Sequence, residues 1–229
     1  MRFLTFIFSL FFMTANAQPK DTILYVYDPM CGWCYGFDPV MEKISGEWAD
    51  KFQFHTISGG MITGDRQGVI APQMATYILN TVPRLEQMTG VKFGESFLKA
   101  LRDGTYYASS VRPSRAMTVF RSMHSNKAVS FANAMQRKLF LEGKSLNDDA
   151  TYRELCADFN VDFDSFLKEL NAPQSLAAAE EDFALTSQLG VSGFPAVIAV
   201  RNGKAQMLTS GYSDADALVK KLEAFHRNK

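Results

Sequence analysis

The sequence predicts an α/β fold in which a helical domain is inserted into a small sheet, and three observations predict it. An apolar strand over 23–27 is followed directly by Cys31 and Cys34, with a helical pattern after them. From about residue 61 to 189 the pattern is almost entirely helical. A strand and hairpin pattern then returns over 196–209 before a last helix.

The first part of the chain supplies two strands and a helix. After the strand over 23–27, apolar residues at helical spacing occupy 37–48. Pro39 lies inside this helix and should kink it, because proline removes a backbone hydrogen bond. Alternation over 52–57 predicts a second strand, which Ser58-Gly59-Gly60 ends.

Turn and capping residues divide the helical block that follows. The expected segments are one that begins at Pro113 and ends before Ser125-Asn126, one over 128–139 closed by Gly143, one from Asn147-Asp148 through Phe159, one capped by Asp162 or Asp164, and one over 174–189 that ends at Gly190. We interpret their apolar faces as core rather than as cofactor contacts.

The end of the chain returns to strands. Asn202-Gly203 lies between apolar runs over 196–200 and 204–209 and is a strong hairpin signal. Asp214 can cap a final helix. This order of elements is that of a thioredoxin fold with a helical domain inserted between the second strand and the strand that Pro195 opens.

The start of the chain is typical of a secretory leader. Residues 3–13 are apolar apart from Thr5 and Ser9, Arg2 supplies a positive end, and Ala15-Asn16-Ala17 fits a cleavage site. We therefore expect cleavage after Ala17 and a periplasmic protein. The expected division is a signal peptide over 1–17, a discontinuous thioredoxin-fold domain over 18–60 and 186–229, and a helical insertion domain over 61–185.

Charge and composition narrow the class of partner. The 24 basic residues equal the 24 acidic ones, so the chain has no basic field for nucleic acid. No later segment approaches the roughly 18 consecutive apolar residues of a membrane span. No separate dimerisation domain precedes Ile23, which favours a monomer.

Cys31 and Cys34 carry the expected chemistry. Because the helix begins at or near the cysteines, Cys31 should lie over unpaired backbone N–H groups that favour the thiolate. One helical turn later, Cys34 can attack a mixed disulfide held on Cys31 and release the partner. Cys31 is then the nucleophile and Cys34 the resolving thiol of a thiol-disulfide exchange that needs no cofactor.

Other uses of the cysteines stay open. A structural zinc site needs four ligands, and only Cys156 and three scattered histidines remain to supply them, so we expect no metal. A structural disulfide would also suit an exported protein. Cys156 shares an apolar helical face with Tyr152 and Leu155, which favours an inert buried thiol over a third redox thiol.

A second motif that bears on the chemistry is Val191-Ser192-Gly193-Phe194-Pro195. A proline that opens a central strand is tolerated only where its N–H is not required, and a cis bond would turn the preceding backbone groups outward. Phe194 could then pair with an extended substrate beside Cys31. An ordinary trans proline is the alternative, and this stretch alone does not decide between them. Met30 and Trp33 flank Cys31 and are expected to line a substrate groove.

Together these motifs resemble the DsbA-type thiol-disulfide oxidoreductases. The stretch over 28–37 is similar to the FrnE-like branch of predicted protein-disulfide isomerases, and Ser114-Arg115-Ala116 and 135–143 extend the likeness into the insertion. The resemblance implies exported protein thiols or disulfides as substrates and an unidentified redox partner that recycles the dithiol.

Residue by residue, the resemblance implies Cys31 as attacking thiol, Cys34 as resolving thiol and Pro195 as a cis-proline. This chain departs from the family at the buried general base, whose position holds Tyr25. Asp28 could replace it as a relay for the proton of Cys34, or it could serve as the helix N-cap, and the cap is the interpretation we favour.

Two other function classes stay open. One is a thioredoxin-fold binding module or chaperone without redox activity. The other is a glutathione-dependent transferase or isomerase of the kappa type, which shares the fold but lacks the cysteine pair. Oxidase, isomerase and reductase differ in redox potential and recycling partner, which these residues do not specify.

Overall fold

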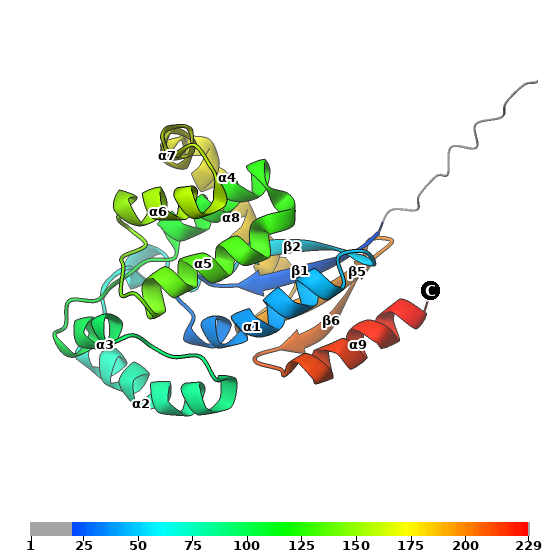
Figure 1. Cartoon of the computed structure of the whole chain (residues 1–229), viewed down its shortest axis with the longest axis horizontal. Coiled ribbons are helices and arrows are strands. Elements are labelled where there is room, and N and C mark those ends of the chain that lie inside the picture. Colours follow the sequence, from blue (N-terminus) through cyan, green and yellow to red (C-terminus); the bar gives the residue numbers. More distant parts are fainter. Residues whose placement is uncertain (1–19, 229) are drawn as a thin grey trace, which may run out of the picture.

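The computed structural model describes residues 20–228, so the predicted leader lies outside the described residues. β1 (Asp21–Tyr27), β2 (Phe52–Ser58), β5 (Ala196–Arg201) and β6 (Lys204–Ser210) form a sheet in the order β2-β1-β5-β6. β1 is parallel to β2 and antiparallel to β5, and β6 is antiparallel to β5 (Figure 1). The four strands are those that the sequence predicts.

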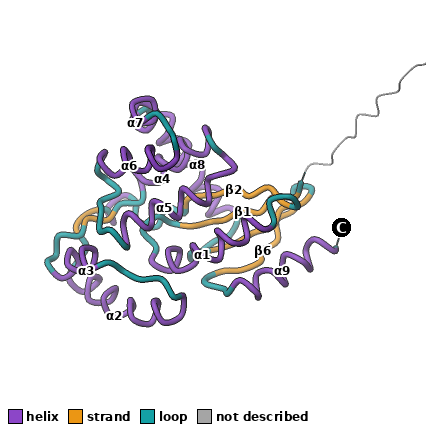
Figure 2. The backbone as a smooth tube through the Cα atoms, viewed as in Figure 1, coloured by secondary structure: helices purple, strands orange, loops and turns teal. Residues whose placement is uncertain are grey.

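Helices cover both faces of the sheet. α1 (Gly32–Glu47) and α9 (Ala215–Arg227) pack on one face, and α8 (Pro173–Gln188) lies on the other (Figures 1 and 2). Side chains alternate along β1, so Tyr25 joins the larger core beneath α1 while Val26 joins a smaller cluster on the α8 side. The site therefore starts from a strand that is buried on both faces.

The predicted hairpin and final cap are confirmed. Asn202 and Gly203 take φ angles of 50° and 73°, which a two-residue hairpin turn needs and these residues tolerate. Asp214 accepts a hydrogen bond from the N–H of Ala217 at 2.8 Å and so begins α9.

The block between β2 and β5 is helical, as predicted. Besides α8, its helices are α2 (Pro72–Thr89), α3 (Glu95–Arg102), α4 (Val111–Met123), α5 (Ala128–Phe140), α6 (Asp149–Phe159) and α7 (Phe163–Asn171), with short 3-10 turns at Gly64–Arg66 and Ser125–Lys127. Asp162 caps α7 by accepting the N–H of Ser165 at 2.8 Å. The boundary between the two expected domains stays a prediction.

Two details differ from expectation. β3 (Gly68–Val69) and β4 (Tyr107–Ala108) form a small antiparallel sheet inside the block, and such short strands show no alternation in the sequence. α4 begins at Val111 rather than at Pro113, because the first turn of a helix tolerates proline where the N–H has no helical partner.

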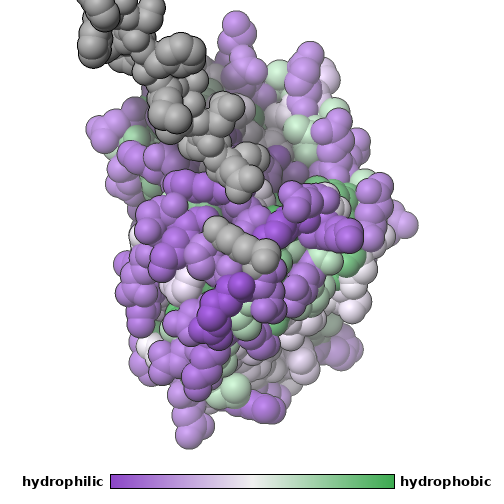
Figure 3. Space-filling view, turned by 90° about the vertical axis from the view of Figure 1, so that its right-hand side faces the viewer, coloured by the Kyte–Doolittle hydropathy of each residue, from purple (hydrophilic) through white to green (hydrophobic). Residues whose placement is uncertain are grey.

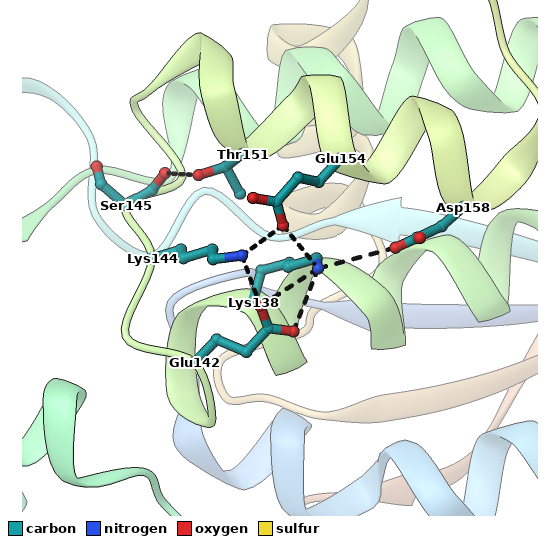
Figure 4. A network of polar contacts seen from close by, with 7 residues as sticks. All are labelled: Lys138, Glu142, Lys144, Ser145, Thr151, Glu154 and Asp158. Atoms are coloured by element: carbon teal, nitrogen blue, oxygen red, sulfur yellow. Dashed lines mark hydrogen bonds and ion pairs between the residues drawn. The ribbon is translucent and has the colours of Figure 1, made fainter.

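An ion-pair network joins α5 to α6 (Figure 4). Lys138 of α5 lies 2.9 Å from Glu154 and 3.8 Å from Asp158, both on α6, and 3.2 Å from Glu142. Lys144 pairs with Glu142 at 2.9 Å and also with Glu154. Charges that share partners in this way stabilise more than isolated surface pairs.

The face shown in Figure 3 is largely hydrophilic. It is the right-hand side of Figure 1, where the C-terminal end of the chain lies. None of the helices between residues 20 and 228 is both long and apolar enough to cross a bilayer.

A largely buried ion pair ties α4 and α8 to β2. Arg121 of α4 donates two hydrogen bonds of 3.0 Å to Asp182 of α8 and a third to the carbonyl of Thr56. Asp182 also accepts the N–H of Ser58 at 3.2 Å. The Arg121 and Asp182 side chains are 15% and 8% exposed, so solvent screens the pair weakly. This pair fixes the edge of the sheet to the helices that follow it.

We predict that Asp182→Asn lowers the free energy of unfolding by about 3 kcal/mol, because it leaves the largely buried charge of Arg121 without an anionic partner. Urea unfolding followed by circular dichroism measures the loss. Asp103→Asn is the matched control, since Asp103 pairs with Lys99 on an exposed part of the surface where ion pairs contribute little. Equal losses in the two variants would contradict the prediction.

Candidate active site

Cys31 directly precedes α1 and is its N-cap residue. Its N–H donates to the carbonyl of Asp28 at 3.0 Å and closes the turn after β1. Its own carbonyl accepts the N–H groups of Cys34 and Tyr35 at 3.0 and 3.1 Å. As the N-cap residue, Cys31 lies next to the first N–H groups of the helix, and its side chain accepts no hydrogen bond from them.

The two sulfurs have different surroundings. Cys31 is 7% exposed, Cys34 is fully buried, and both are free thiols. Burial raises the pKa of the Cys34 thiol well above its usual range, and the hydrogen bond and charge of Cys31 raise it further. A nucleophile and a resolving thiol need this asymmetry. The assignment of these roles stays a prediction.

The chain brings Phe194 and Pro195 directly beside the cysteines. The Phe194-Pro195 peptide bond is cis. The Cys31 thiol donates to the carbonyl of Phe194, with 3.7 Å between sulfur and oxygen. Two motifs that are far apart in the sequence therefore meet at one sulfur atom.

Gly59 makes room for Phe194. A Cβ atom at Gly59 would lie 2.1 Å from the Phe194 ring, far inside van der Waals contact. Gly59 follows β2 directly, and its N–H donates to the carbonyl of Tyr27 at 2.7 Å. The sequence shows only that Gly59 ends a strand, because a glycine needed for close approach looks the same as a turn glycine.

The prediction that Asp28 is the helix N-cap is wrong. The N-cap is Cys31, since the turn between the two residues delays the start of the helix. The buried Asp28 carboxylate accepts the N–H of Met30 at 2.9 Å, the N–H of Met61 at 2.7 Å and the hydroxyl of Ser110 at 2.8 Å. Burial raises the pKa of Asp28, and these hydrogen bonds oppose the rise. The carboxylate thus joins the reactive turn to the insertion.

Gln136 of α5 holds the same turn from another side. Its buried Nε2 lies 3.1, 3.4 and 3.2 Å from the carbonyl oxygens of Asp28, Pro29 and Cys31. Gln136 lies in a stretch that resembles the family, yet the spacing of residues cannot predict this contact because it joins distant parts of the chain.

An apolar groove of about 630 Å³ opens beside Cys31. Its lining residues include Met30, Trp33, Met61, Ile70, Met74 and Tyr77. Val69, Met74 and Tyr77 each leave more than half of their surface exposed. Exposed apolar residues around a groove are typical of a surface that binds a partner.

Cys156 lies on α6, within the insertion. It is 1% exposed, and burial raises the pKa of its thiol to about 11. These surroundings favour the inert thiol. Between residues 20 and 228, no three His, Cys, Asp or Glu side chains are gathered in a way that could hold a metal ion.

Comparisons with known proteins agree with this geometry. The sequence profile of the DSBA-like thioredoxin domain matches residues 22–223. A protein from Nitrosomonas europaea, described as a candidate protein disulfide isomerase, has a similar structure with a TM-score of 0.82; the two are 24% identical over 91% of this chain and 98% of that one. The resemblance to DsbA-type oxidoreductases is thereby confirmed.

Two further similar proteins are named for different functions, one as a disulfide reductase and one as an adapter protein. The cytosolic disulfide reductase DsbM from Pseudomonas aeruginosa is 26% identical, covers 91% of this chain and 100% of its own, and gives a TM-score of 0.75. The ClpXP adapter protein SpxH from Bacillus subtilis is 20% identical over 81% of this chain. This chain spans about 61% of the length of that adapter.

We predict that Gly59→Ala slows the attack of Cys31 on a disulfide reagent by about 10-fold, because the added methyl group displaces Phe194 and the carbonyl beside the sulfur. Stopped-flow reaction with Ellman's reagent measures the rate. Gly193→Ala is the matched control, since no atom lies within 4 Å of the added Cβ atom. If both variants react as fast as the parent, the close approach of Phe194 does not matter for reactivity.

Proposed function

The chain belongs to the DSBA-like thioredoxin domain family, and from this premise we propose a thiol-disulfide oxidoreductase of the oxidase or isomerase type. It acts through the dithiol of Cys31-Gly32-Trp33-Cys34. One observation carries the proposal: Cys31 lies at the start of α1 and against the carbonyl of Phe194, while Cys34 is buried behind it. A reactive sulfur and a protected one are then in place for exchange.

In the oxidising direction, the pair starts as a Cys31–Cys34 disulfide. A substrate thiolate attacks the sulfur of Cys31, the bond to Cys34 breaks, and Cys34 leaves and takes up a proton. A second substrate thiolate attacks the first substrate sulfur, which forms the substrate disulfide and releases Cys31 as a thiolate. Two electrons have passed to the pair, and an oxidising redox partner removes them.

In the isomerising direction, the pair starts reduced. The Cys31 thiolate attacks a wrong substrate disulfide, forms a mixed disulfide and releases one substrate thiolate, which attacks a different disulfide of the substrate. A thiolate set free by this exchange then attacks the substrate sulfur bound to Cys31, which forms the new substrate disulfide and releases Cys31 as a thiolate. If this rearrangement stalls, Cys34 attacks the mixed disulfide and frees the substrate.

The groove supports a polypeptide substrate. Its apolar lining begins at Met30 and Trp33, on either side of Cys31, and continues along α2 to Met74 and Tyr77. A partly unfolded chain exposes apolar side chains that such a surface would bury. Backbone groups at Phe194 lie beside the sulfur, where an extended segment could align.

The cellular setting belongs to the same proposal. The leader pattern supports export after cleavage behind Ala17 and exported proteins as substrates. We propose that the mature chain works as a periplasmic monomer and exchanges electrons with a separate redox partner. The similar protein DsbM is named as cytosolic, so the two settings are distinguished by where the mature chain is recovered.

A binding module is the second candidate. The similarity to SpxH, whose name describes an adapter, supports it. In that case the groove would hold a partner protein, and the cysteines would not cycle between the dithiol and the disulfide. A test of dithiol turnover separates this candidate, and also the glutathione-dependent kappa class, from the oxidoreductase.

We predict that Cys31→Ser lowers insulin reduction and peptide-dithiol oxidation by about 1,000-fold or more, because no other sulfur in the pair can form the mixed disulfide. Cys34→Ser should instead trap a covalent complex between Cys31 and the substrate, visible on a non-reducing gel. Cys156→Ser is the matched control and should keep the parental rate. Turnover at the parental rate in Cys31→Ser would exclude Cys31 as the nucleophile, and absence of turnover in the parent protein would favour the binding module.

We predict that the mature protein, purified from the periplasm of an expressing cell, begins at Gln18. N-terminal sequencing checks this directly. Ala17→Phe should block cleavage and leave the full-length precursor, because the cleavage site accepts only small residues. Recovery of the parent protein from the cytosol with Met1 or Arg2 still present would contradict export.

A further inference from the structure

α1 carries a second buried acid, Asp38, which no step above uses. Asp38 is 5% exposed, and neither carboxylate oxygen has a hydrogen-bond partner among the described residues. Buried carboxylates normally have donors around them, as Asp28 does, because an unpaired one is costly. A buried acid in this state is more typical of a functional site than of a structural contact.

Asp38 lies close to the redox pair. It follows Cys34 by one helical turn on the same face of α1, where residues four apart are neighbours. Tyr25 of β1 is near both groups, since the charges of Cys34 and Asp38 each raise the pKa of its buried phenol. The Tyr25 hydroxyl also has no partner among the described residues. These three groups form a buried polar cluster behind Cys31.

Asp38 also borders a solvent-filled cleft, although both of its carboxylate oxygens are buried. It lines an open cleft of about 660 Å³ between α1, α5 and the connection from α2 to α3. Exposed Glu42 and Arg137 line the same cleft. Nδ2 of Asn133 donates to the carbonyl of Asp38 at 3.3 Å and to the carboxylate of Glu42 at 2.6 Å. A proton on Asp38 is therefore near groups that exchange with water.

We propose that Asp38 accepts the proton of Cys34 when this thiol resolves a mixed disulfide on Cys31. The inference rests on the proposed function. The Cys34 sulfur supplies the electron pair of the new bond to Cys31, the bond between Cys31 and the substrate breaks, and the substrate leaves as a thiolate. The proton of Cys34 passes to the Asp38 carboxylate. In the reverse reaction, Asp38 returns this proton to Cys34.

The surroundings of Asp38 make its carboxylate a suitable acceptor for the proton of Cys34. Burial raises the pKa of Asp38 well above its usual range, the charges of Glu42 and Cys31 raise it further, and Arg137 lowers it. Such a carboxylate is a stronger base than an exposed one, which favours transfer of the Cys34 proton to it. The titratable or charged groups around it are Cys31, Cys34, Tyr35 and Glu42 of α1, Tyr25 and Tyr27 of β1, Arg137 of α5, and Lys92 across the cleft.

Asp28 is the competing acid. Its charge acts on Cys34, but its carboxylate is already bound to three donors that stabilise the charged form. Asp28→Asn should therefore weaken the fold around the turn and leave the pH dependence of resolution in place.

The test separates attack from resolution. In a Cys156→Ser background, the reduced protein is mixed with Ellman's reagent; one coloured thiolate is released when Cys31 attacks and a second when Cys34 resolves. We expect Asp38→Asn to slow the second step at pH 7 by about 100-fold, since a positioned base contributes this much, and to change the first step far less. The parental rise of the second rate with pH, which follows ionisation of Asp38, should disappear.

Stability gives a second readout. The pKa of Asp38 is higher in the folded state than in the unfolded chain, where it is about 4. The free energy of unfolding is therefore highest below the unfolded-state pKa, and it falls as the pH rises through the folded-state pKa of Asp38. Asp38→Asn removes this loss, so the variant should be at least as stable as the parent at neutral pH. A variant that unfolds more easily there would make Asp38 a structural residue and overturn the inference.

The outcomes distinguish this inference from the proposed function. Absence of the second step in the parent protein would refute the oxidoreductase itself. If the parent resolves the mixed disulfide and Asp38→Asn does so equally fast with the same pH profile, only the role of Asp38 is overturned. Loss of the pH dependence in Asp28→Asn instead would assign the relay to Asp28. Asp50→Asn, at an exposed aspartate, controls for the change in net charge.

Discussion

The buried carboxylate of Asp28 is the contact on which the geometry of this site depends. It accepts hydrogen bonds from three segments: from the N–H of Met30 in the turn before α1, from the N–H of Met61 in the segment that follows β2, and from the hydroxyl of Ser110 just before α4. Because an unpaired buried carboxylate is costly, these segments must converge wherever Asp28 is placed. Gln136 then closes the turn from α5. The reactive turn and the helical insertion therefore form as one unit, and the insertion does more than cover the sheet.

Much of the fold follows from local patterns in the sequence. The strand before Cys31, the hairpin at Asn202-Gly203 and the caps Asp162 and Asp214 depend on residues only a few positions apart. The cysteine pair is equally local, because one helical turn separates the two sulfurs. Local patterns of this kind can be recognised in a single sequence. These elements could therefore be predicted, together with the chemistry that the cysteine pair suggests.

The remaining parts of the site depend on contacts between distant segments. Gly59 accommodates Phe194, which lies far after it in the sequence, and Gln136 binds a turn that lies far before it in the chain. The Asp-Pro pair predicts a helix start at Asp28, but the partners of Asp28 at Met61 and Ser110 hold it in the preceding turn. Asp38 has an ordinary helical position, and only the fold shows that it is buried.

The methionine side chains that line the groove make substrate binding sensitive to oxidation. Met30, Met61 and Met74 all contribute to its lining, and unbranched sulfur-containing side chains adapt to ligands of many shapes. The same atoms are oxidised to sulfoxides, which are polar and would spoil an apolar surface. An organism that keeps this protein in an oxidising compartment would therefore need methionine sulfoxide repair there to preserve substrate capture, even while the cysteines themselves remain intact.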